Sequence, residues 1–579
     1  MFGRRRKKND IAYKLGCELP LPERFRFADK QAGKTLEAGK GRLLVTMLGF
    51  CVAFAIVGGQ LCRISLRGAA PALRREEKPQ TRAVDIKMNR ADITDRNGVV
   101  LATSLPSADL YVDTENLKNP ETLAAALAET LPDVKYKSLL KKLKSGKKFV
   151  YVKRNLIPRE LYEANRLGFP QLNFEIKEMR IYPQGSLFAH VLGSTDIDNN
   201  GISGAEKAFN KKLSESKENV RLSLDVGIQS SVRAVLSENI GKYSAEGGAA
   251  VLMNAKTGEI VSMVSLPDFD PNNLQNAAKS NLFNAATLGV YEVGSVMKMF
   301  NTAIGLETKK IKVTDTVDAS HPVVLANYTI QDVPKLRREL SVPEIMIHSS
   351  NIGSAKIALA VGAEKQREYL QKFGFFNAPQ IELPEKGRPL YPEKWRDVST
   401  ATIGYGYGLS VSPLHVVAAA AAVVNGGVYH TPTLLSRRSG KEIVGHRVIS
   451  DKTSKTMRAI MREVVIKGSG RRANVAGFEV GGKTGSARKL VNGKYVEGSL
   501  RTSFLSAFPM DDPQYVLMVM LDSPKKIKET YYLNTAAWNA VPTAEQIITT
   551  VAPQLGIMPR PFDPKREAPY VKSALETQE

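Results

Sequence analysis

The stretch Val293-Gly-Ser295-Val-Met-Lys298 opens a long apolar segment that continues through Met-Phe-Asn-Thr-Ala-Ile. In a helix, residues three apart occupy neighbouring positions of one face, so Lys298 can reach the hydroxyl of Ser295. If burial keeps the lysine amine neutral, the amine can take the serine proton and make Ser295 a nucleophile. A serine at a helix start also has free backbone N–H groups beside it, which suit a developing oxyanion.

The Ser-x-x-Lys spacing alone is weak evidence. Five other serines have a lysine three residues later: Ser138, Ser145, Ser214, Ser486 and Ser523. Most of those lie in charged stretches, whereas Ser295 opens an apolar helix. An ordinary helix N-cap remains the alternative for Ser295.

Two later motifs complete a candidate site. In Ser349-Ser350-Asn351 a hydroxyl lies two residues from an amide, which suits proton relay and amide binding, although a helix cap or turn has the same pattern. We expect Gly482-Lys483-Thr484-Gly485-Ser486 on a strand whose twist brings the cation and hydroxyls to one cleft, with the glycines leaving room for a substrate backbone. Lys256-Thr257-Gly258 is similar but lies at a hairpin tip and is interpreted as a turn.

The surrounding pattern predicts an α+β fold. Apolar strands are expected at 249–254 and 260–264, joined as a hairpin, and at 478–482, 504–508 and 515–521. Apolar helices are expected from Ser295 and near 413–424. Strands, then helices, then returning strands indicate an antiparallel sheet with helices packed on it.

A single membrane anchor is predicted at 43–62, which holds no charged residue over twenty positions and matches the thickness of a bilayer core. Twelve basic residues against five acidic ones precede it, so the N-terminal side is expected in the cytoplasm and the rest exported. A cleaved signal peptide, with small residues near Ala69, Ala70 and Ala72, and a buried core helix are the alternatives.

The predicted domains follow from these features. They are a basic cytoplasmic tail at 1–42, the anchor at 43–62, a stalk at 63–81, a non-catalytic pedestal at 82–235, a catalytic domain at 236–558 and a polar tail at 559–579. The pedestal contains an Asn97-Gly98 hairpin signal and Lys-rich amphipathic helices near 120–170.

Composition excludes several function classes. The net charge of +24 is spread along the chain without a nucleic-acid motif, which favours an anionic membrane or polymer over nucleic acid. Cys17, Cys51 and Cys62 all precede residue 63, so the main body has no thiolate zinc site or disulfide framework. The six histidines show no ligand spacing, and His190 and His415 are expected to pack or cap. No metal and no organic cofactor are expected.

The three motifs, in this order, are typical of penicillin-binding proteins and class A β-lactamases. The chain as a whole resembles a class B penicillin-binding protein, and within it the cell-division transpeptidases. The resemblance also rests on the stretches 95–102, 180–185, 201–206, 266–272, 404–413 and 502–504. Val293, Ala91 and Ser486 depart from residues common in that family, without loss of a reactive group.

The resemblance implies the roles of three catalytic residues. Ser295 would attack the carbonyl between the last two D-alanines of a stem peptide and release the terminal one. Lys298 would act as its base, and Ser349 would pass a proton to the departing amine. The backbone N–H groups of Ser295 and Ser486 would form the oxyanion hole.

The resemblance also implies how substrate is held. Asn351 would bind the substrate amide, and Lys483, Thr484, Gly485 and Ser486 would hold the terminal carboxylate. β-Lactams would acylate Ser295. The expected partners are peptidoglycan stem peptides, a membrane-embedded glycan polymerase and other division proteins at the division site of the inner membrane, with the catalytic domain periplasmic. An elongation-type transpeptidase, a β-lactamase, a β-lactam sensor and a non-catalytic division scaffold are the alternatives.

Overall fold

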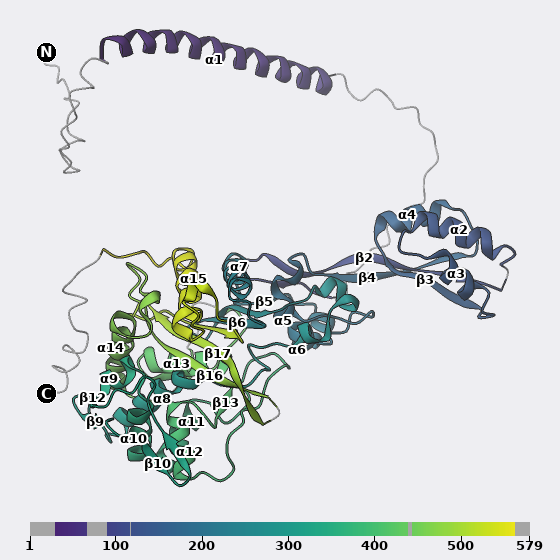
Figure 1. Cartoon of the computed structure of the whole chain (residues 1–579). Helices are drawn as coiled ribbons and strands as arrows, with labels where there is room; N and C mark the ends of the chain where they lie inside the picture. The colour runs from purple at the N-terminus through teal and green to yellow at the C-terminus, as the bar shows by residue number, and fades with distance from the viewer. Residues whose placement is uncertain (1–28, 67–89, 116, 438–442, 492, 562–579) are drawn as a thin grey trace. The chain divides into compact units, whose positions relative to one another are not determined.

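The computed structural model describes residues 29–66, 90–115, 117–437, 443–491 and 493–561 (Figure 1). The chain divides into two units, residues 1–85 and 86–579, which are described separately. The first contains α1 (Asp29–Leu66), whose segment Leu44–Arg63 is long and apolar enough to cross a membrane and has no buried residue. This agrees with the predicted anchor. The predicted stalk lies mostly outside the described residues.

An antiparallel sheet of five strands forms the centre of the catalytic part, in the order β16-β17-β18-β6-β7. The strands are β6 (Gly247–Asn254), β7 (Ile260–Leu266), β16 (Gly481–Val491), β17 (Lys494–Phe508) and β18 (Tyr515–Asp522). The predicted 249–254/260–264 hairpin is confirmed, because Ala250 pairs with Val264. β16 lies at the edge and pairs only with β17 among the strands described.

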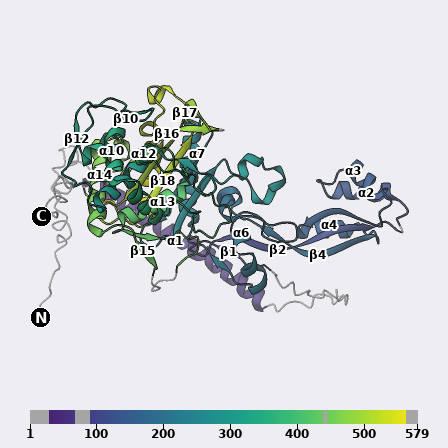
Figure 2. The same ribbon diagram turned by 90° about the horizontal axis from the view of Figure 1, so that it is seen from below.

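Helices cover both faces of this sheet (Figures 1 and 2). Alternate residues of β6 enter two different cores: Ala249 and Val251 face α13 (Pro413–Val424), whereas Ala250 and Leu252 face α7 (Val226–Lys242) and α15 (Ala540–Gln554). Successive side chains of a strand point to opposite faces, so a sheet covered on both sides needs continuously apolar strands. The predicted helix at 413–424 is confirmed, and it is buried throughout.

The strand predicted at 478–482 is wrong in extent. Phe478 and Val480 are buried in the core beneath α15, which explains their apolar character. Gly477 and Glu479 both have positive φ, at 85° and 45°, which an extended strand does not allow. The strand therefore begins at Gly481 and includes the whole Lys-Thr-Gly-Ser motif.

A helical layer lies beside the sheet and holds the other motifs. Its helices are α8 (Met297–Glu307), α9 (Val342–Ile347), α10 (Asn351–Val361), α11 (Ala363–Lys372), α12 (Asp397–Tyr405) and α14 (Asp451–Lys467). Short strand pairs join them: β8 (Tyr291–Glu292) with β13 (Ser410–Val411), β9 (Thr316–Asp318) with β12 (Glu339–Ser341), β10 (Val323–Leu325) with β11 (Tyr328–Ile330), and β14 (Val428–His430) with β15 (Gly445–Arg447). Serine N-caps start several of the helices, as at Ser341 and Ser450.

The pedestal, here residues 90–235, is built on a second sheet with β1 (Ile93–Thr94), β2 (Val100–Asp113), β3 (Phe149–Leu156), β4 (Leu172–Ile181) and β5 (Val220–Arg221). Helices α2 (Pro120–Thr130), α3 (Tyr136–Leu143) and α4 (Pro158–Arg166) pack on its far part around their own core, while α5 (Ala189–Leu192) and α6 (Gly204–Ala208) are nearer the catalytic part. The Asn97-Gly98 hairpin is confirmed: Asp95 Oδ1 accepts the N–H groups of Asn97 and Val99.

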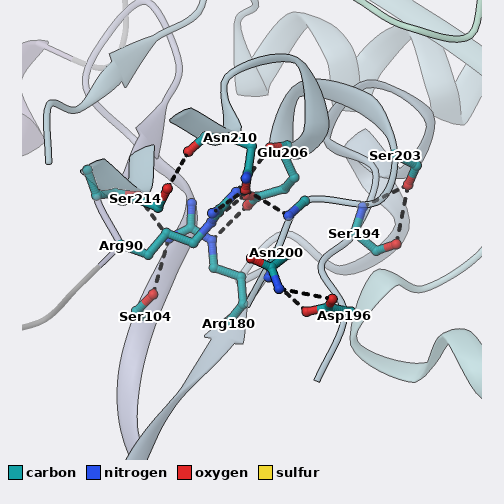
Figure 3. A network of polar contacts seen from close by, with 12 residues as sticks. Arg90, Ser104, Arg180, Ser194, Asp196, Asn200, Ser203, Glu206, Asn210 and Ser214 are labelled. Atoms are coloured by element: carbon teal, nitrogen blue, oxygen red, sulfur yellow. Dashed lines mark hydrogen bonds and ion pairs between the residues drawn. The ribbon is translucent and has the colours of Figure 1, made fainter. Parts of the chain in front are cut away.

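Three pedestal stretches far apart in sequence meet at one buried ion cluster (Figure 3). Glu206 Oε2 accepts Arg90 Nε–H at 2.8 Å, and Glu206 Oε1 accepts Arg180 Nε–H at 2.7 Å. Asn210 accepts a second bond from Arg90 at 2.8 Å. All three charged side chains are at most 2% exposed. The cluster joins the chain near residue 90, strand β4 and helix α6.

Candidate active site

Ser295 lies in a single 3₁₀ turn, Gly294–Val296, just before α8 begins at Met297. The helix predicted to start at Ser295 therefore starts two residues later, at Met297. Gly294 has φ +56°, and its N–H donates to the Gly406 carbonyl at 3.2 Å. A Cβ on Gly294 would lie 2.9 Å from the Ser486 carbonyl oxygen, so this turn runs directly against strand β16.

Lys298 is fully buried and lies against the second motif. Its Nζ donates to the Ser349 carbonyl at 2.5 Å, to Ser349 Oγ at 3.1 Å and to Asn351 Oδ1 at 2.7 Å. These contacts join the first and second motifs. Among the residues that the structure describes, the hydroxyl of Ser295 makes no hydrogen bond, to Lys298 or to any other group.

Lys483 reaches the same hydroxyl from the sheet. Its Nζ, also fully buried, donates to Ser349 Oγ at 2.9 Å and to the Thr484 carbonyl at 3.3 Å. The hydroxyl of Ser349 thus lies between two lysine amines from different elements. A proton on either amine has a hydrogen-bonded route to Ser349.

Ser349 is held in an unusual backbone conformation. Its φ is +58°, in the left-handed region that residues other than glycine seldom occupy. The next residue, Ser350, caps α10 by accepting the Gly353 N–H at 2.9 Å. The helix-cap interpretation is confirmed for Ser350, and the catalytic interpretation of Ser349 stays a prediction.

Asp332 supports this turn and was missed by sequence reasoning. Its Oδ2 accepts the Ser350 hydroxyl at 2.6 Å, and its Oδ1 accepts the backbone N–H groups of Asn351 at 2.5 Å and Ile352 at 3.0 Å. The carboxylate is only 4% exposed. It lies 18 to 20 residues before its partners, and no local motif marks it.

The hydroxyls of the third motif point away from the two lysines. Thr484 Oγ1 hydrogen-bonds with Ser469 Oγ at 2.7 Å, and Ser486 Oγ accepts the Ala536 N–H at 3.0 Å. This follows the alternation of side chains along a strand. The structure brings Lys298, Ser349, Asn351 and Lys483 together, and the prediction that Thr484 and Ser486 share a carboxylate with Lys483 stays a prediction.

The glycines of the third motif are explained by packing. A Cβ on Gly482 would lie 2.4 Å from the Leu505 carbonyl, and one on Gly485 would lie 2.4 Å from the Val293 carbonyl. The absence of a side chain at Gly485 thus leaves room for the turn that carries Ser295. The expected role in admitting a substrate backbone is not needed to explain these two glycines.

Burial sets the electrostatics of the two lysines. Loss of water lowers the pKa of Lys298 well below its usual value, the nearby Lys483 charge lowers it further, and Asp332 opposes both. Burial alone lowers the pKa of Lys483 to about 7. In both cases burial favours the neutral amine over the charged one, which is the direction that a lysine base requires.

The carboxyl of Glu292 and the rings of Tyr407 and Tyr495 lie close together near the turn that carries Ser295. Glu292 accepts the Gly408 N–H at 2.7 Å and the Tyr495 hydroxyl at 3.0 Å, and burial raises its pKa. The ring of Tyr407 lies 6.0 Å from that of Tyr495. A Cβ on Gly406 would lie 1.8 Å from the Gly294 carbonyl, which explains a glycine in the 404–413 stretch.

The structural interpretations of other residues are confirmed. Asn254 Oδ1 accepts the N–H groups of Lys256 and Thr257, and Lys256 pairs with Asp512, so the second Lys-Thr-Gly is a turn. His415 caps α13 together with Ser412, and His190 bonds the Asn281 carbonyl. No group of three or more His, Cys, Asp or Glu within the described ranges is placed to hold a metal ion.

Comparison with known proteins finds two family models along the chain. Residues 248–547 match the penicillin binding protein transpeptidase domain, and residues 85–233 match the penicillin-binding protein dimerisation domain. The two matches together span most of the chain on the C-terminal side of α1.

Similar whole proteins are found as well. A probable peptidoglycan D,D-transpeptidase FtsI of Caulobacter vibrioides is 34% identical over 89% of this chain and 88% of its own length. Stage V sporulation protein D of Bacillus subtilis is 30% identical over 90% and 86%, and peptidoglycan D,D-transpeptidase FtsI of Escherichia coli K12 is 26% identical over 83% and 87%. Penicillin binding protein 3 of Mycobacterium tuberculosis, solved with aztreonam, has the same fold, with a TM-score of 0.64 at 24% identity over 82% of this chain and 97% of that one.

Proposed function

This chain belongs to the penicillin-binding transpeptidases, as a class B member of the FtsI type, and from that premise we propose that it cross-links peptidoglycan as a serine D,D-transpeptidase. One observation carries the proposal. The Ser349 hydroxyl lies 3.1 Å and 2.9 Å from two buried lysine amines, in a cluster that begins one helical turn from Ser295.

The first half-reaction forms an ester on Ser295. Neutral Lys298 takes the hydroxyl proton while Ser295 Oγ attacks the carbonyl between the two terminal D-alanines. The C–N bond then breaks, and the departing D-alanine amine receives a proton through Ser349. The amine of a neighbouring stem peptide attacks the ester in the second half, forms the new amide and returns the proton to Ser295. No bond needs a metal or an organic cofactor.

Substrate binding is assigned to the remaining motif residues. Asn351 Oδ1 accepts from Lys298 and Asn351 Nδ2 donates to the Gln331 carbonyl at 3.1 Å, so its second amide N–H is assigned to the substrate amide. Lys483, with the Thr484 and Ser486 hydroxyls and Gly485, is assigned to the terminal carboxylate. The N–H groups of Ser295 and Ser486 are assigned to the oxyanion hole, since Gly294 contacts Ser486.

The proposed cellular role is cell division, and the likeness to relatives named FtsI supports it. The chain is a single-pass membrane protein by its apolar helix. The positive charge before that helix supports a cytoplasmic N-terminus and a periplasmic catalytic domain. A membrane-embedded glycan polymerase and other division proteins are the proposed partners, and β-lactams the inhibitors. The domain limits 82–235 and 236–558 are kept, supported by the matches at 85–233 and 248–547.

Replacement of the nucleophile tests the activity. Ser295→Ala should abolish covalent labelling by a fluorescent penicillin and leave membrane anchoring unchanged. Ser138→Ala is the matched control, because Ser138 also has a lysine three residues later but lies on the exposed side of α3. Labelling that survives Ser295→Ala refutes the nucleophile, and rapid hydrolysis of the drug by the wild type refutes the transferase in favour of a β-lactamase.

Depletion of the protein in growing cells tests the role. Cells that elongate into filaments support division. Cells that become round refute it and support the elongation alternative.

A further inference from the structure

The far end of the pedestal carries a basic cluster that the proposed reaction does not use. Residues 134–149 contain seven lysines and neither Asp nor Glu: Lys135, Lys137, Lys141, Lys142, Lys144, Lys147 and Lys148. They lie on α3 and on the turn that leads into β3, and are called the basic tip below. All seven side chains are exposed.

Most of this charge is not neutralised. Lys144 pairs with Glu121 and Lys148 pairs with Glu115. The other five lysines of the basic tip form no ion pair within the part of the chain that the structure describes. Uncompensated charges of one sign so close together raise the local potential and attract anions.

The basic tip surrounds a cavity. Its volume is about 810 Å³, and its lining includes Lys141, Lys142, Lys144, Lys147, Phe149 and Tyr151. This volume lies in the range of sites that hold small molecules or short segments of a polymer. Cations and aromatic rings therefore face the same space.

The aromatic residues form an edge-to-face cluster in which Phe149 is the ring most open to solvent, since the Arg154 guanidinium lies over the Tyr151 ring, 4.1 Å from its centroid. The ring of Phe149 lies 4.7 Å from that of Tyr151 and 4.6 Å from that of Tyr111, and Phe149 is 44% exposed. Phe149 and Tyr151 alternate with the buried Val150, so they share one face of β3. An exposed aromatic face of this kind offers apolar contact to the C–H face of a sugar ring.

Protection of a sheet edge is the other explanation for lysines here. β3 lies at the edge of its sheet, and edge strands commonly carry charges that prevent pairing with another chain. That explanation accounts for Lys153 and Arg154 on the strand itself. It does not account for Lys141, Lys142, Lys144 and Lys147, which precede the strand and line the cavity.

We propose that the basic tip binds an anionic saccharide, with a sugar ring on Phe149 and Tyr151 and its acidic group beside the lysines. The saccharide we commit to is the glycan strand of peptidoglycan freed of its stem peptides, which then bears free lactyl carboxylates, and this choice rests on the proposed function. A phosphate-bearing sugar presents the same chemistry. An anionic lipid surface is a poorer fit, because four of the lysines and the two rings line a concave site.

Binding to defined glycans tests the proposal. The probe is a soluble peptidoglycan glycan strand stripped of its stem peptides, titrated against the full-length protein in neutral detergent. An uncharged chitin oligosaccharide, a sugar phosphate and vesicles containing phosphatidylglycerol are titrated in parallel. The variant is Lys141→Glu with Lys142→Glu and Lys147→Glu. The matched control is Lys279→Glu with Lys310→Glu and Lys394→Glu, three exposed lysines that form no ion pair among the described residues and lie outside the basic tip.

The basic-tip variant should bind the glycan strand about tenfold more weakly or worse, and the wild-type affinity should fall as salt rises. The control triple should bind like the wild type. Phe149→Ala should weaken the binding of the glycan strand and of the chitin oligosaccharide to the same extent. Equal affinity of the basic-tip variant and the wild type overturns the proposal. Binding of the vesicles without binding of the glycan strand also overturns it. Aggregation of the basic-tip variant with unchanged glycan affinity overturns it too, because the lysines would then only protect the sheet edge.

A second readout separates this proposal from the proposed function. Penicillin labelling of Ser295 should be unchanged in the basic-tip variant. If the wild type is not labelled, the proposed function fails while glycan binding can still be measured. If labelling is normal and glycan binding is absent, only the assignment of the basic tip fails.

Discussion

In the part of the chain that the structure describes, the pedestal and the active site each hold a buried cluster of positive side chains, and the two differ in what accepts their hydrogen bonds. In the pedestal, Arg90 and Arg180 both donate to the carboxylate of Glu206. In the active site, Lys298 and Lys483 both donate to the neutral hydroxyl of Ser349. Asp332, whose charge acts on Lys298, makes its own hydrogen bonds to Ser350, Asn351 and Ile352.

The difference teaches how burial serves structure in one place and chemistry in the other. Arginine stays protonated in proteins, so a buried carboxylate gives it a permanent partner and the pair fixes the chain. A buried lysine without such a partner loses its proton readily. Only the second kind of cluster can accept a proton from a serine.

Lys298→Met sharpens this comparison most strongly. Removing the base should lower the rate of Ser295 acylation by a β-lactam about 10²–10⁴-fold. The melting temperature should change little, because relief of the buried amine offsets the donor that the Ser349 carbonyl and Asn351 Oδ1 lose. Stopped-flow acylation and thermal unfolding measure the two effects. A variant that acylates at the wild-type rate would remove Lys298 from the mechanism.

Glu206→Gln tests the other cluster. It leaves two buried guanidinium groups without a carboxylate and should lower the free energy of unfolding by about 3–5 kcal/mol. Penicillin labelling of the folded fraction should persist. The control is Glu163→Gln, which breaks an exposed pair with Arg166 and should change stability by about 0.5 kcal/mol or less. An equal effect of the two substitutions would show that the buried ion cluster is not structural.

Asp332→Asn lies between the two cases. The amide cannot accept the Ser350 hydroxyl and both backbone N–H groups as the carboxylate does, and the loss of such bonds corresponds to about 1–3 kcal/mol, or roughly 10- to 100-fold in acylation rate. Because the Asp332 charge raises the pKa of Lys298, its removal should lower that pKa further. The acid limb of the pH–rate profile should therefore move to lower pH. A lower rate with an unmoved profile would mean that Asp332 acts on the backbone alone.

Ser486→Ala should have the smallest effect. The hydroxyl accepts one neutral bond from the Ala536 N–H, which contributes about 0.5–1.5 kcal/mol to stability. Acylation should fall less than about tenfold, because the oxyanion hole uses the backbone N–H of Ser486, and Lys483 and Thr484 still hold the carboxylate when its hydroxyl is lost. A loss as large as that of Lys298→Met would contradict the position of this side chain.

The sequence predicted those parts of the molecule that local spacing encodes. The anchor, the β6–β7 hairpin, helix α13 and the three motifs each have a signal within a few residues, and the structure confirms the elements. The extent of β16 was missed because Phe478 and Val480 are apolar for burial and not for strand pairing. Asp332, Ser469 and Ala536 contact the motifs only through the tertiary fold, so no pattern in a single chain marks them.

The pH dependence of Ser295 acylation tests the central claim most directly, namely that burial makes the lysine base neutral near physiological pH. Acylation needs the unprotonated amine, so the rate should rise with pH and reach half its maximum well below 10.5, the usual lysine pKa. Because two amines share Ser349, the apparent value belongs to the pair, and the pKa of about 7 for Lys483 locates the expected region. A rate that keeps climbing until the pH approaches 10.5 would contradict the account.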